Sequence, residues 1–454
     1  MTDDARIRDA VRAGAGGFVD ALKEACSIPS ISTEGQGLEE MASWLESRLK
    51  GLRAEVRRLE VPGSPPALLG EIPGPGSRTL MIYDHYDVQP VDPLDLWEAP
   101  PFEPDEREGR LYARGAADNK GDLVARLSAL EVYRDVVGEI PFTIKFFIEG
   151  EEETGSPHFE DICRDFAADL SADDCVWEGG MFDHRSRPVI YFGCKGLLYV
   201  ELRCQKIADD QHSSIAGYAP SAAWRLVQAL STLKDADGRI SIPGFYDEVL
   251  DPEPADRQAI GDVEFEEQEE MKRLGVTEFV GGRSGDALKQ ELFFSPTANI
   301  AGFLTGYTVP RASKTVLPAQ ATAKMDFRLV PDQDPKDIAK KLRSHLDSGG
   351  FDDVEVEVLS AEHPSKSPMD TPLGRAVRER GEGWFTERMK VWPMMYATGP
   401  MYPIAKGLGV PICSPPGVGR PDSRVHAPNE NARIEDYLEM VGFTVAYMEA
   451  YGAF

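Results

Sequence analysis

The stretch YDHYDVQP, residues 83–90, follows the apolar run LMI at residues 80–82, a pattern typical of a short buried strand. Residues i and i+2 of a strand point to the same side, so we expect His85 and Asp87 to face one pocket. The pair suits a metal ligand and a carboxylate that fixes which ring nitrogen faces the metal. A capped turn at a strand end uses the same residue types, and this stretch alone leaves both interpretations open.

A second motif, RGAADNKG at residues 114–121, leads into a predicted helix over residues 121–137, where leucines recur at helical spacing. Asp118 stands just before this helix. It could be an N-terminal cap, or a ligand that bridges two cations with its two oxygens. Position alone does not choose between these interpretations.

A third motif, EGEEETGS at residues 149–156, follows the run FTIKFFI at residues 142–148, whose β-branched and aromatic content predicts a buried strand. Glutamates gathered at one strand end repel one another, so they need either a solvated loop or nearby cations. With cations present, one glutamate could bind metal while its neighbour moves protons. A solvated acidic turn is the simpler alternative for this motif taken alone.

The chain has 454 residues, which is too long for one ordinary hydrophobic core and indicates two or three domains. Its six cysteines show no C-x-x-C spacing, which argues against a disulfide framework and a thiolate zinc site. We therefore expect a reducing cytoplasm. The acidic N-terminus lacks an apolar segment and no run of about 18 apolar residues occurs, so neither a secretion signal nor a membrane span is expected.

Acidic residues dominate the charge of the chain. Lysine and arginine number 49 against 77 aspartates and glutamates, which gives a net charge of −28 at pH 7. This charge repels nucleic acid phosphates and anionic lipid head groups, so we expect neither nucleic acid nor membrane partners. The acidic balance could reflect a saline cytoplasm or simply a soluble acidic protein.

The spacing of apolar residues predicts helices over residues 5–26 and 38–52, and a strand at residues 55–59. Alternating strands and helices favour an α/β fold with a mixed or parallel sheet that helices cover. From about Gly196 the pattern changes, and the interval 247–270 is acidic and expected on the surface. Strands and helices expected in this second region cover residues 197–203, 220–233, 319–330 and 335–346.

The three motifs, in this order along the chain, resemble the M20 metallopeptidase family. That family includes the carnosine-type dipeptidases, carboxypeptidase G2, acetylornithine deacetylase and succinyl-diaminopimelate desuccinylase. The resemblance implies a two-domain α/β fold: a mixed-sheet catalytic domain with two metal ions, and an inserted α+β lid and dimerisation domain. The implied boundaries are residues 1–195 and 364–454 for the catalytic domain and residues 196–363 for the lid.

The resemblance also implies a set of metal ligands. Two zinc-type ions would be bridged by Asp118, with manganese or cobalt as alternatives to zinc. His85 and Glu178 would be the remaining protein ligands of one ion. Glu153 and His426 would complete the other.

Three further acidic residues follow from the same resemblance. Glu152 would be the general base on the water between the ions, and Asp87 would orient the His85 ring. Asp174 is the alternative to Glu178 as a ligand, because the spacing to the strand that follows does not match the dipeptidases cleanly.

In the implied lid, the segment DDQHSS around His212 resembles the family's histidine motif, in which a histidine of the partner subunit contacts the oxyanion. Such a donor stabilises a transition state by about 3 kcal/mol. Thr315 and Arg328 lie in segments that match those holding the substrate's C-terminal carboxylate in dipeptidases. The guanidinium of Arg328 suits bidentate carboxylate binding. Without the resemblance, His212 is a loop histidine and Arg328 could pair with a surface acid.

The segment ATGPMYP, residues 397–403, departs from the carnosine-type dipeptidases. Met401 stands where those enzymes have a serine that helps to hold the substrate carboxylate. Carboxylate binding is therefore expected to depend more on Arg328. The glycine-rich segment GVGRPDS, residues 417–423, has no P-loop lysine and is expected to be a loop that frames the site.

Together, the motifs and the resemblance predict a metal-dependent hydrolase that cleaves an amide bond next to a free carboxylate, with a small peptide as substrate. Two alternatives stay open. An N-acyl-amino-acid deacylase would use the same metals and base, whereas a non-catalytic binding protein would keep the fold without the chemistry. The presence together of Glu152, Asp87 and both candidate histidines argues against the binding protein. The expected assembly is a cytoplasmic homodimer.

Overall fold

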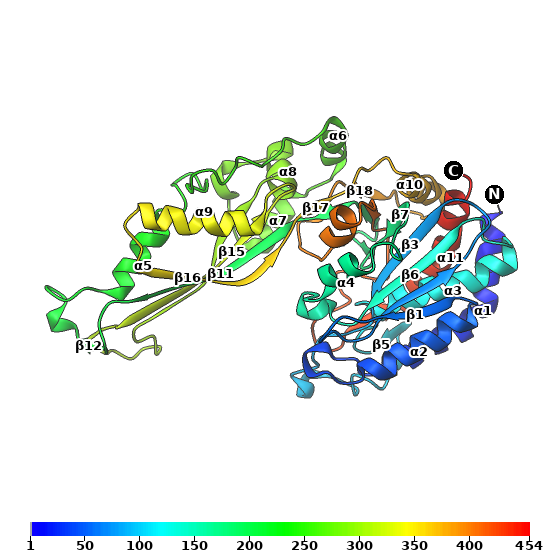
Figure 1. Ribbon diagram of the computed structural model, residues 1–454, viewed down its shortest axis with the longest axis horizontal. Helices are drawn as coiled ribbons and strands as arrows, with labels where there is room; N and C mark the ends of the chain where they lie inside the picture. The colour runs from blue at the N-terminus through cyan, green and yellow to red at the C-terminus, as the bar shows by residue number, and fades with distance from the viewer. Residues whose placement is uncertain (1) are drawn as a thin grey trace. The chain divides into compact units, whose positions relative to one another are not determined.

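The computed structural model describes residues 2–454, which form two compact units (Figure 1). The first unit contains the chain up to Gly193, together with Lys366–Pro393 and Pro400–Phe454. The second unit contains Cys194–Ser365 and the short segment Met394–Gly399, whose neighbours in sequence belong to the first unit. No helix among the described residues is long and apolar enough to cross a membrane.

A six-stranded mixed sheet forms the centre of the first unit. In their order across the sheet, its strands are β1 (Glu55–Leu59), β2 (Ala67–Ile72), β6 (Thr143–Glu149), β3 (Thr79–His85), β7 (Asp174–Val176) and β19 (Ile412–Cys413). The strands β1, β2 and β6 pair antiparallel, whereas β6, β3, β7 and β19 run parallel. The mixed sheet expected from the sequence is therefore present.

Both faces of this sheet are covered, as a parallel sheet requires. Ile82 and Phe146 pack into the main hydrophobic core together with residues of the long helices. Their chain neighbours Tyr83 and Phe147, which point to the other face, contact the ring of Phe159. The helices of this unit are α1 (Asp4–Ser27), α2 (Leu38–Gly51), α3 (Lys120–Val136), α4 (Phe159–Asp165), α10 (Pro372–Trp384) and α11 (Ile434–Tyr451).

The helices predicted at the N-terminus are confirmed as α1 and α2, and α3 begins one residue before its predicted start. α1, α3 and α11 pack against one another (Figure 1). The buried Lys120 amino group donates to the carbonyl oxygens of Ala25 and Ile28 at 3.0 and 2.5 Å. A cation bound to the last carbonyls of a helix is favourable, so Lys120 joins the start of α3 to the end of α1.

The strand register decides which motifs meet. His85 on β3 lies opposite Glu149 on β6, so the loop that carries Glu152 begins beside the histidine. Ile82 lies opposite Val176 on β7, so the chain leaves β7 toward Glu178 at the same edge. The carboxyl ends of parallel strands meet at one edge of a sheet, and this is where ligands bind in open α/β folds.

Two small three-stranded sheets complete the first unit. One contains β20 (Asn431–Arg433), β5 (Arg110–Tyr112) and β4 (Asp105–Arg107), and so brings the chain after His426 next to the chain before Asp118. The other contains β18 (Lys390–Trp392), β9 (Pro188–Tyr191) and β8 (Met181–Phe182). The short strands β10 (Gly193–Cys194) and β17 (Ser365–Lys366) lie where the chain passes between the units.

The second unit is built on an antiparallel sheet of four strands. In order across the sheet these are β13 (Thr297–Thr305), β15 (Gln320–Leu329), β11 (Gly196–Gln205) and β16 (Val354–Glu362). The helices α5 (Ala222–Ser231) and α9 (Pro335–Ser348) pack on it and close a second hydrophobic core. The strands and helices that the sequence predicts in this region are confirmed as β11, α5, β15 and α9.

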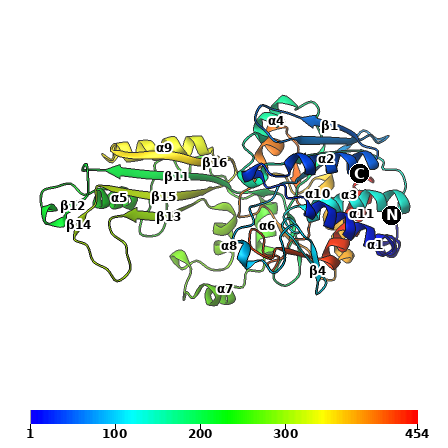
Figure 2. The same cartoon turned by 90° about the horizontal axis from the view of Figure 1, so that it is seen from below.

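Shorter elements extend from this sheet. The strands β12 (Gln211–His212) and β14 (Val316–Leu317) pair antiparallel and join two loops that are distant in sequence (Figure 2). The region around the acidic interval forms the helices α6 (Pro254–Asp262), α7 (Glu267–Leu274) and α8 (Gly285–Phe294).

Candidate metal centre

His85 is the last residue of β3, and its side chain is 1% exposed. Its Nδ1 atom lies 3.1 Å from the Asp87 carbonyl oxygen and 3.3 Å from Asp87 Oδ1. The backbone and the side chain of Asp87 therefore both hold one edge of the ring. The other nitrogen, Nε2, is left to face the acidic residues at the end of the sheet.

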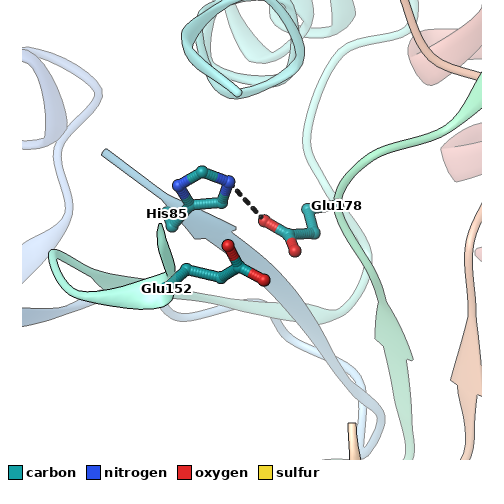
Figure 3. Close-up of side chains that lie close together, drawn as sticks. All are labelled: His85, Glu152 and Glu178. Atoms are coloured by element: carbon teal, nitrogen blue, oxygen red, sulfur yellow. Dashed lines mark ion pairs between the residues drawn. The ribbon is translucent and has the colours of Figure 1, made fainter. Parts of the chain in front are cut away.

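Three side chains from different strand ends form a first group of possible metal ligands. His85, Glu152 and Glu178 each offer one ligand atom, and these atoms all lie within 4.8 Å of one another. The Nε2 atom of His85 is 3.1 Å from Glu178 Oε2, and Figure 3 shows the Glu152 carboxylate turned toward the same space. Glu152, which the sequence predicts as the general base, thus lies within ligand distance of this group.

A second group consists of Asp118, Glu153 and His426, whose ligand atoms also lie within 4.8 Å of one another. The Nε2 atom of His426 is 3.1 Å from Asp118 Oδ2 and 3.0 Å from Glu153 Oε2. His426 is half-exposed, whereas Glu153 is nearly buried. This group opens toward solvent more than the first group does.

Asp118 joins the two groups through its two carboxylate oxygens. Its Oδ1 atom is 3.2 Å from His85 Nε2, and its Oδ2 atom is 3.1 Å from His426 Nε2. One oxygen for each histidine is the arrangement that a bridging carboxylate between two cations needs. All five predicted ligands and Glu152 therefore come together from distant parts of the chain.

Asp87 has a second task that the sequence did not reveal. Its Oδ1 atom accepts a hydrogen bond from the Glu152 amide at 3.1 Å, and its Oδ2 atom accepts one from the Glu153 amide at 3.0 Å. The Gln89 amide group also donates to Glu153 Oε2 at 2.8 Å. One buried carboxylate thus fixes the turn of both glutamates and contacts the His85 ring.

Glu430 is a buried residue that sequence reasoning missed. Its Oε1 atom accepts hydrogen bonds from the amides of Ala117 and Asp118, both at 3.0 Å. Its Oε2 atom accepts from the Gly115 amide at 3.0 Å and from Arg114 Nη1 at 2.7 Å. The signal was an isolated acid in the segment HAPNE that follows Val425. Its partners could not be read from the sequence because they lie more than 300 residues away.

The electrostatics of the centre reflect many acids in a small volume. Burial, with the neighbouring carboxylates, raises the pKa of Glu152 to about 8. Burial also raises the pKa of Glu178 well above its usual value. Hydrogen bonds to Asp118 and Glu153 raise the pKa of His426 to about 10. Groups that hold protons this tightly release them when divalent cations take the place of the protons.

The donor set fits two divalent cations. Two imidazole nitrogens and three carboxylates, with Asp118 facing both histidines, suit zinc and also manganese or cobalt. Asp174 belongs to neither group. It lies opposite Leu80 at the start of β7, whereas Glu178 follows the end of that strand. Of the two alternatives that the sequence left open, the structure places Glu178 beside His85.

The residues of the second unit that the sequence predicts to contact the substrate take part in two hydrogen-bonded pairs, Thr315 with His212 and Arg328 with Thr398. Thr315 Oγ1 lies 3.0 Å from His212 Nε2, although the two residues are 103 positions apart. The Ser214 amide donates to His212 Nδ1 at 3.1 Å. Arg328 Nη1 donates to the hydroxyl of Thr398, in the segment where the sequence departs from the dipeptidases.

The fold and this centre define the class of protein: a mixed α/β metallopeptidase. The family model that describes peptidase family M20/M25/M40 matches residues 81–450, and the chain belongs to this family. The predicted M20 metallopeptidase and its α/β fold are therefore confirmed.

Individual relatives agree with this assignment. The chain is 27% identical over 471 residues to the Cys-Gly metallodipeptidase DUG1 of Candida albicans, covering 96% of this chain and 94% of that protein. It is 28% identical to the Beta-Ala-His dipeptidase of Mus musculus, covering 86% and 83%. The structure of the M20 metallo-carboxypeptidase Sso-CP2 from Sulfolobus solfataricus matches with a TM-score of 0.89 and 36% identity, covering 96% and 99%. Human carnosine dipeptidase 1 matches with a TM-score of 0.78 and 26% identity over the whole of both chains.

The ligand assignment predicts different effects for two acids near β7. We expect Glu178→Gln to lower the metal content of dialysed protein, because a charged ligand beside His85 is lost. Asp174→Asn should leave the metal content unchanged. Mass spectrometry of the bound metals measures both. The assignment is wrong if Asp174→Asn loses metal and Glu178→Gln does not.

Asp174→Asn should also change how stability depends on pH. Burial raises the pKa of Asp174 from 3.8 to about 6. The unfolded chain therefore loses this proton first, and the ionised native side chain lowers stability increasingly as pH rises from about 4 to about 6. The free energy of unfolding of Asp174→Asn minus that of wild type should therefore be about 2 kcal/mol larger at pH 8 than at pH 4, the variant being relatively more stable at pH 8. Denaturant unfolding at the two pH values measures this, and an unchanged difference would contradict it.

Proposed function

We propose that this chain is a two-metal peptidase that hydrolyses dipeptides or other short peptides at the amide bond next to the free carboxylate. The observation that carries the proposal is the pair of histidine–carboxylate groups joined by Asp118, with Glu152 at their edge. The names of the relatives, Cys-Gly and Beta-Ala-His dipeptidases, support a dipeptide as substrate.

Glu152 is the proposed general base. Two bound cations would lower the pKa of a shared water and polarise the scissile carbonyl. Glu152 would then take a proton from that water and pass it to the leaving amine. Its backbone amide is held by Asp87, so its position does not depend on the metals alone. Glu153, on the same turn, is the proposed ligand.

His212 is the proposed donor to the developing oxyanion. The Ser214 amide can only donate, so the Nδ1 atom that accepts its hydrogen bond carries no proton. The neutral ring therefore carries its hydrogen on Nε2, where it can donate. In this structure that N–H faces Thr315 Oγ1 at 3.0 Å, so Thr315 fixes the direction of the ring, and the oxyanion would replace its hydroxyl as the acceptor. A hydrogen-bond donor of fixed orientation is what oxyanion stabilisation requires.

Arg328 and Thr398 are the proposed holders of the substrate carboxylate. The guanidinium of Arg328 donates to the Thr398 hydroxyl, which leaves further N–H groups for a carboxylate. Met401, which takes the place of the dipeptidase serine, is fully buried. We infer that Thr398 supplies the hydroxyl that Met401 lacks.

The second unit is the proposed dimerisation domain. β13 is an edge strand of the four-stranded sheet (Figure 2). It exposes Ile300, Phe303 and Leu304. Trp224 on α5 is 69% exposed. Exposed apolar residues on an unpaired edge favour association with another strand. A second copy of the chain is the proposed occupant of this edge.

The native ion and the compartment are further parts of the proposal. Zinc is the proposed ion, with manganese and cobalt as alternatives that the same ligands accept. All six cysteines are free and buried, which supports a reducing cytoplasm. The substrate is a small molecule, and the charge of −28 supports the absence of nucleic acid and membrane partners.

A substrate panel tests the proposed function. Metal-free protein would be reloaded with zinc, manganese or cobalt and assayed on dipeptides and on N-acyl amino acids. We expect hydrolysis of dipeptides only after reloading, and a lower melting temperature without metal, because ions that bind the native state stabilise it. A preference for N-acyl amino acids would instead identify a deacylase. Full turnover with no metal present would overturn the mechanism.

The roles of the two adjacent glutamates can be separated. We expect Glu152→Gln to lower kcat by at least about 100-fold while both ions stay bound, since it removes a base. Glu153→Gln should lower metal occupancy, since it removes a ligand. Metal analysis and steady-state kinetics on the two variants measure both effects. The reverse pattern of occupancy would show that the two roles are exchanged.

Hybrid dimers test whether His212 serves the partner's centre. Glu152→Ala and His212→Ala should each be nearly inactive as homodimers. Coexpressed in equal amounts, they should form hybrids in half of the dimers, each with one complete site. About one quarter of the wild-type activity should therefore return. Hybrids that are verified by mass and show no recovery would mean that His212 does not act across the dimer.

A further inference from the structure

Arg126, on α3, is a buried arginine that no role described so far uses; its side chain is 4% exposed. Its Nη1 atom donates to Asp84 Oδ1 at 2.6 Å and to the Tyr83 carbonyl at 3.2 Å. Its Nη2 atom donates to the Trp177 carbonyl at 2.9 Å. One guanidinium thus binds the chain at two neighbouring strand ends.

The partners of Arg126 are chain neighbours of the proposed ligands. Asp84 precedes His85 in the sequence, and Trp177 precedes Glu178. A rigid guanidinium with N–H groups at fixed angles sets the distance between the two acceptors it binds. Arg126 therefore fixes how far the end of β3 lies from the end of β7, and with it how far His85 lies from Glu178.

A second path runs from Arg126 through side chains to the ligand itself. Asn119 Nδ2 donates to Asp84 Oδ1 at 2.9 Å and to Glu178 Oε2 at 3.2 Å. The amide group of Asn119 thus joins the carboxylate that Arg126 holds to the carboxylate beside His85. Asn119 also follows Asp118 in the sequence. These side chains are buried, so the orientation of each depends on the next.

The other group of ligands has different support. The backbone amide of Glu153 donates to Asp87, and its carboxylate accepts from Gln89. The Asp118 amide donates to Glu430. None of these hydrogen bonds involves Arg126 or its partners. The two metal positions therefore have different supports, which meet at Asp118 and at Asp87, whose carboxylate also lies beside the His85 ring.

We propose that Arg126 is a positioning residue for one of the two metal positions, the one between His85 and Glu178. It acts through Asp84, Asn119 and the Trp177 carbonyl. The position between Glu153 and His426 does not depend on it. This inference rests on the two-metal function proposed above.

Metal titration of the apo protein tests the inference. Arg126→Met removes all N–H donors, and Arg126→Lys keeps the charge but cannot span the same acceptors. We expect both variants to bind one ion about 10-fold to 100-fold more weakly than wild type, as changes in residues that hold ligands do, and the other ion with little change. Arg134→Met is the matched control, because Arg134 lies on the same helix and, within residues 2–454, its side chain donates to the Leu52 carbonyl alone. Its two affinities should equal those of wild type.

Double variants identify which ion is affected. Arg126→Lys combined with Glu178→Gln should bind metal no more weakly than Glu178→Gln alone, because both changes act on one position. Combined with Glu153→Gln, it should weaken both ions. If the Met and Lys variants do not fold, Asn119→Leu cuts only the side-chain path and should weaken the same ion. Circular dichroism of the apo proteins verifies the fold.

Three results would overturn the inference. Arg126→Lys or Asn119→Leu that binds both ions as wild type does would show that the network does not act on the metal. Equal weakening of both ions would show a general structural role. After either of these two results, the proposed function would still stand if the wild-type protein binds two ions and cleaves dipeptides. Wild-type protein that binds fewer than two ions would overturn both.

Discussion

Repulsion among closely spaced carboxylates is the constraint on which the rest of this structure depends. Asp118, Glu152, Glu153 and Glu178 lie within ligand distance of two histidines at one edge of the central sheet. Burial raises the pKa values of Glu152 and Glu178, and the like charges of neighbouring carboxylates raise them further. Two divalent cations would balance this charge and lower the free energy of the ionised carboxylates. Without cations, the same arrangement raises the free energy of the folded state.

The sheet brings the acids together, but backbone and buried side chains hold them in place. Asp87 fixes the turn with both glutamates, and Glu430 fixes the loop before Asp118. Arg126 fixes the ends of two strands. Buried polar groups of this kind are costly when partly satisfied and rigid when fully satisfied. These hydrogen bonds let the centre keep its geometry although its carboxylates repel one another.

The two units divide the chemistry. The first unit contains every proposed metal ligand and the proposed base. The second unit contains His212, Thr315, Arg328 and Thr398, which form two separate hydrogen-bonded pairs. Of the proposed ligands, His85, Glu153 and Glu178 lie at or just after the ends of the parallel strands β3, β6 and β7, whereas Asp118 and His426 come from loops packed against that edge. The residues proposed to contact the substrate come from two paired loops and from a strand with a neighbouring loop, and loops can differ between relatives without disturbing the core.

The sequence by itself determined the fold class, the order of helices and strands and the identity of the ligand types, because periodicity and short motifs are local properties. It gave Glu178 as the ligand with Asp174 as the alternative, because both are acids near one short strand. The parallel register of β3 with β7 places Asp174 beside Leu80, at the opposite end of β3 from His85, and it places Glu178 3.1 Å from the His85 ring, which supports Glu178. Only the tertiary structure reveals the supporting roles of Glu430 and Arg126, because each binds groups at least 40 residues away that no local pattern connects.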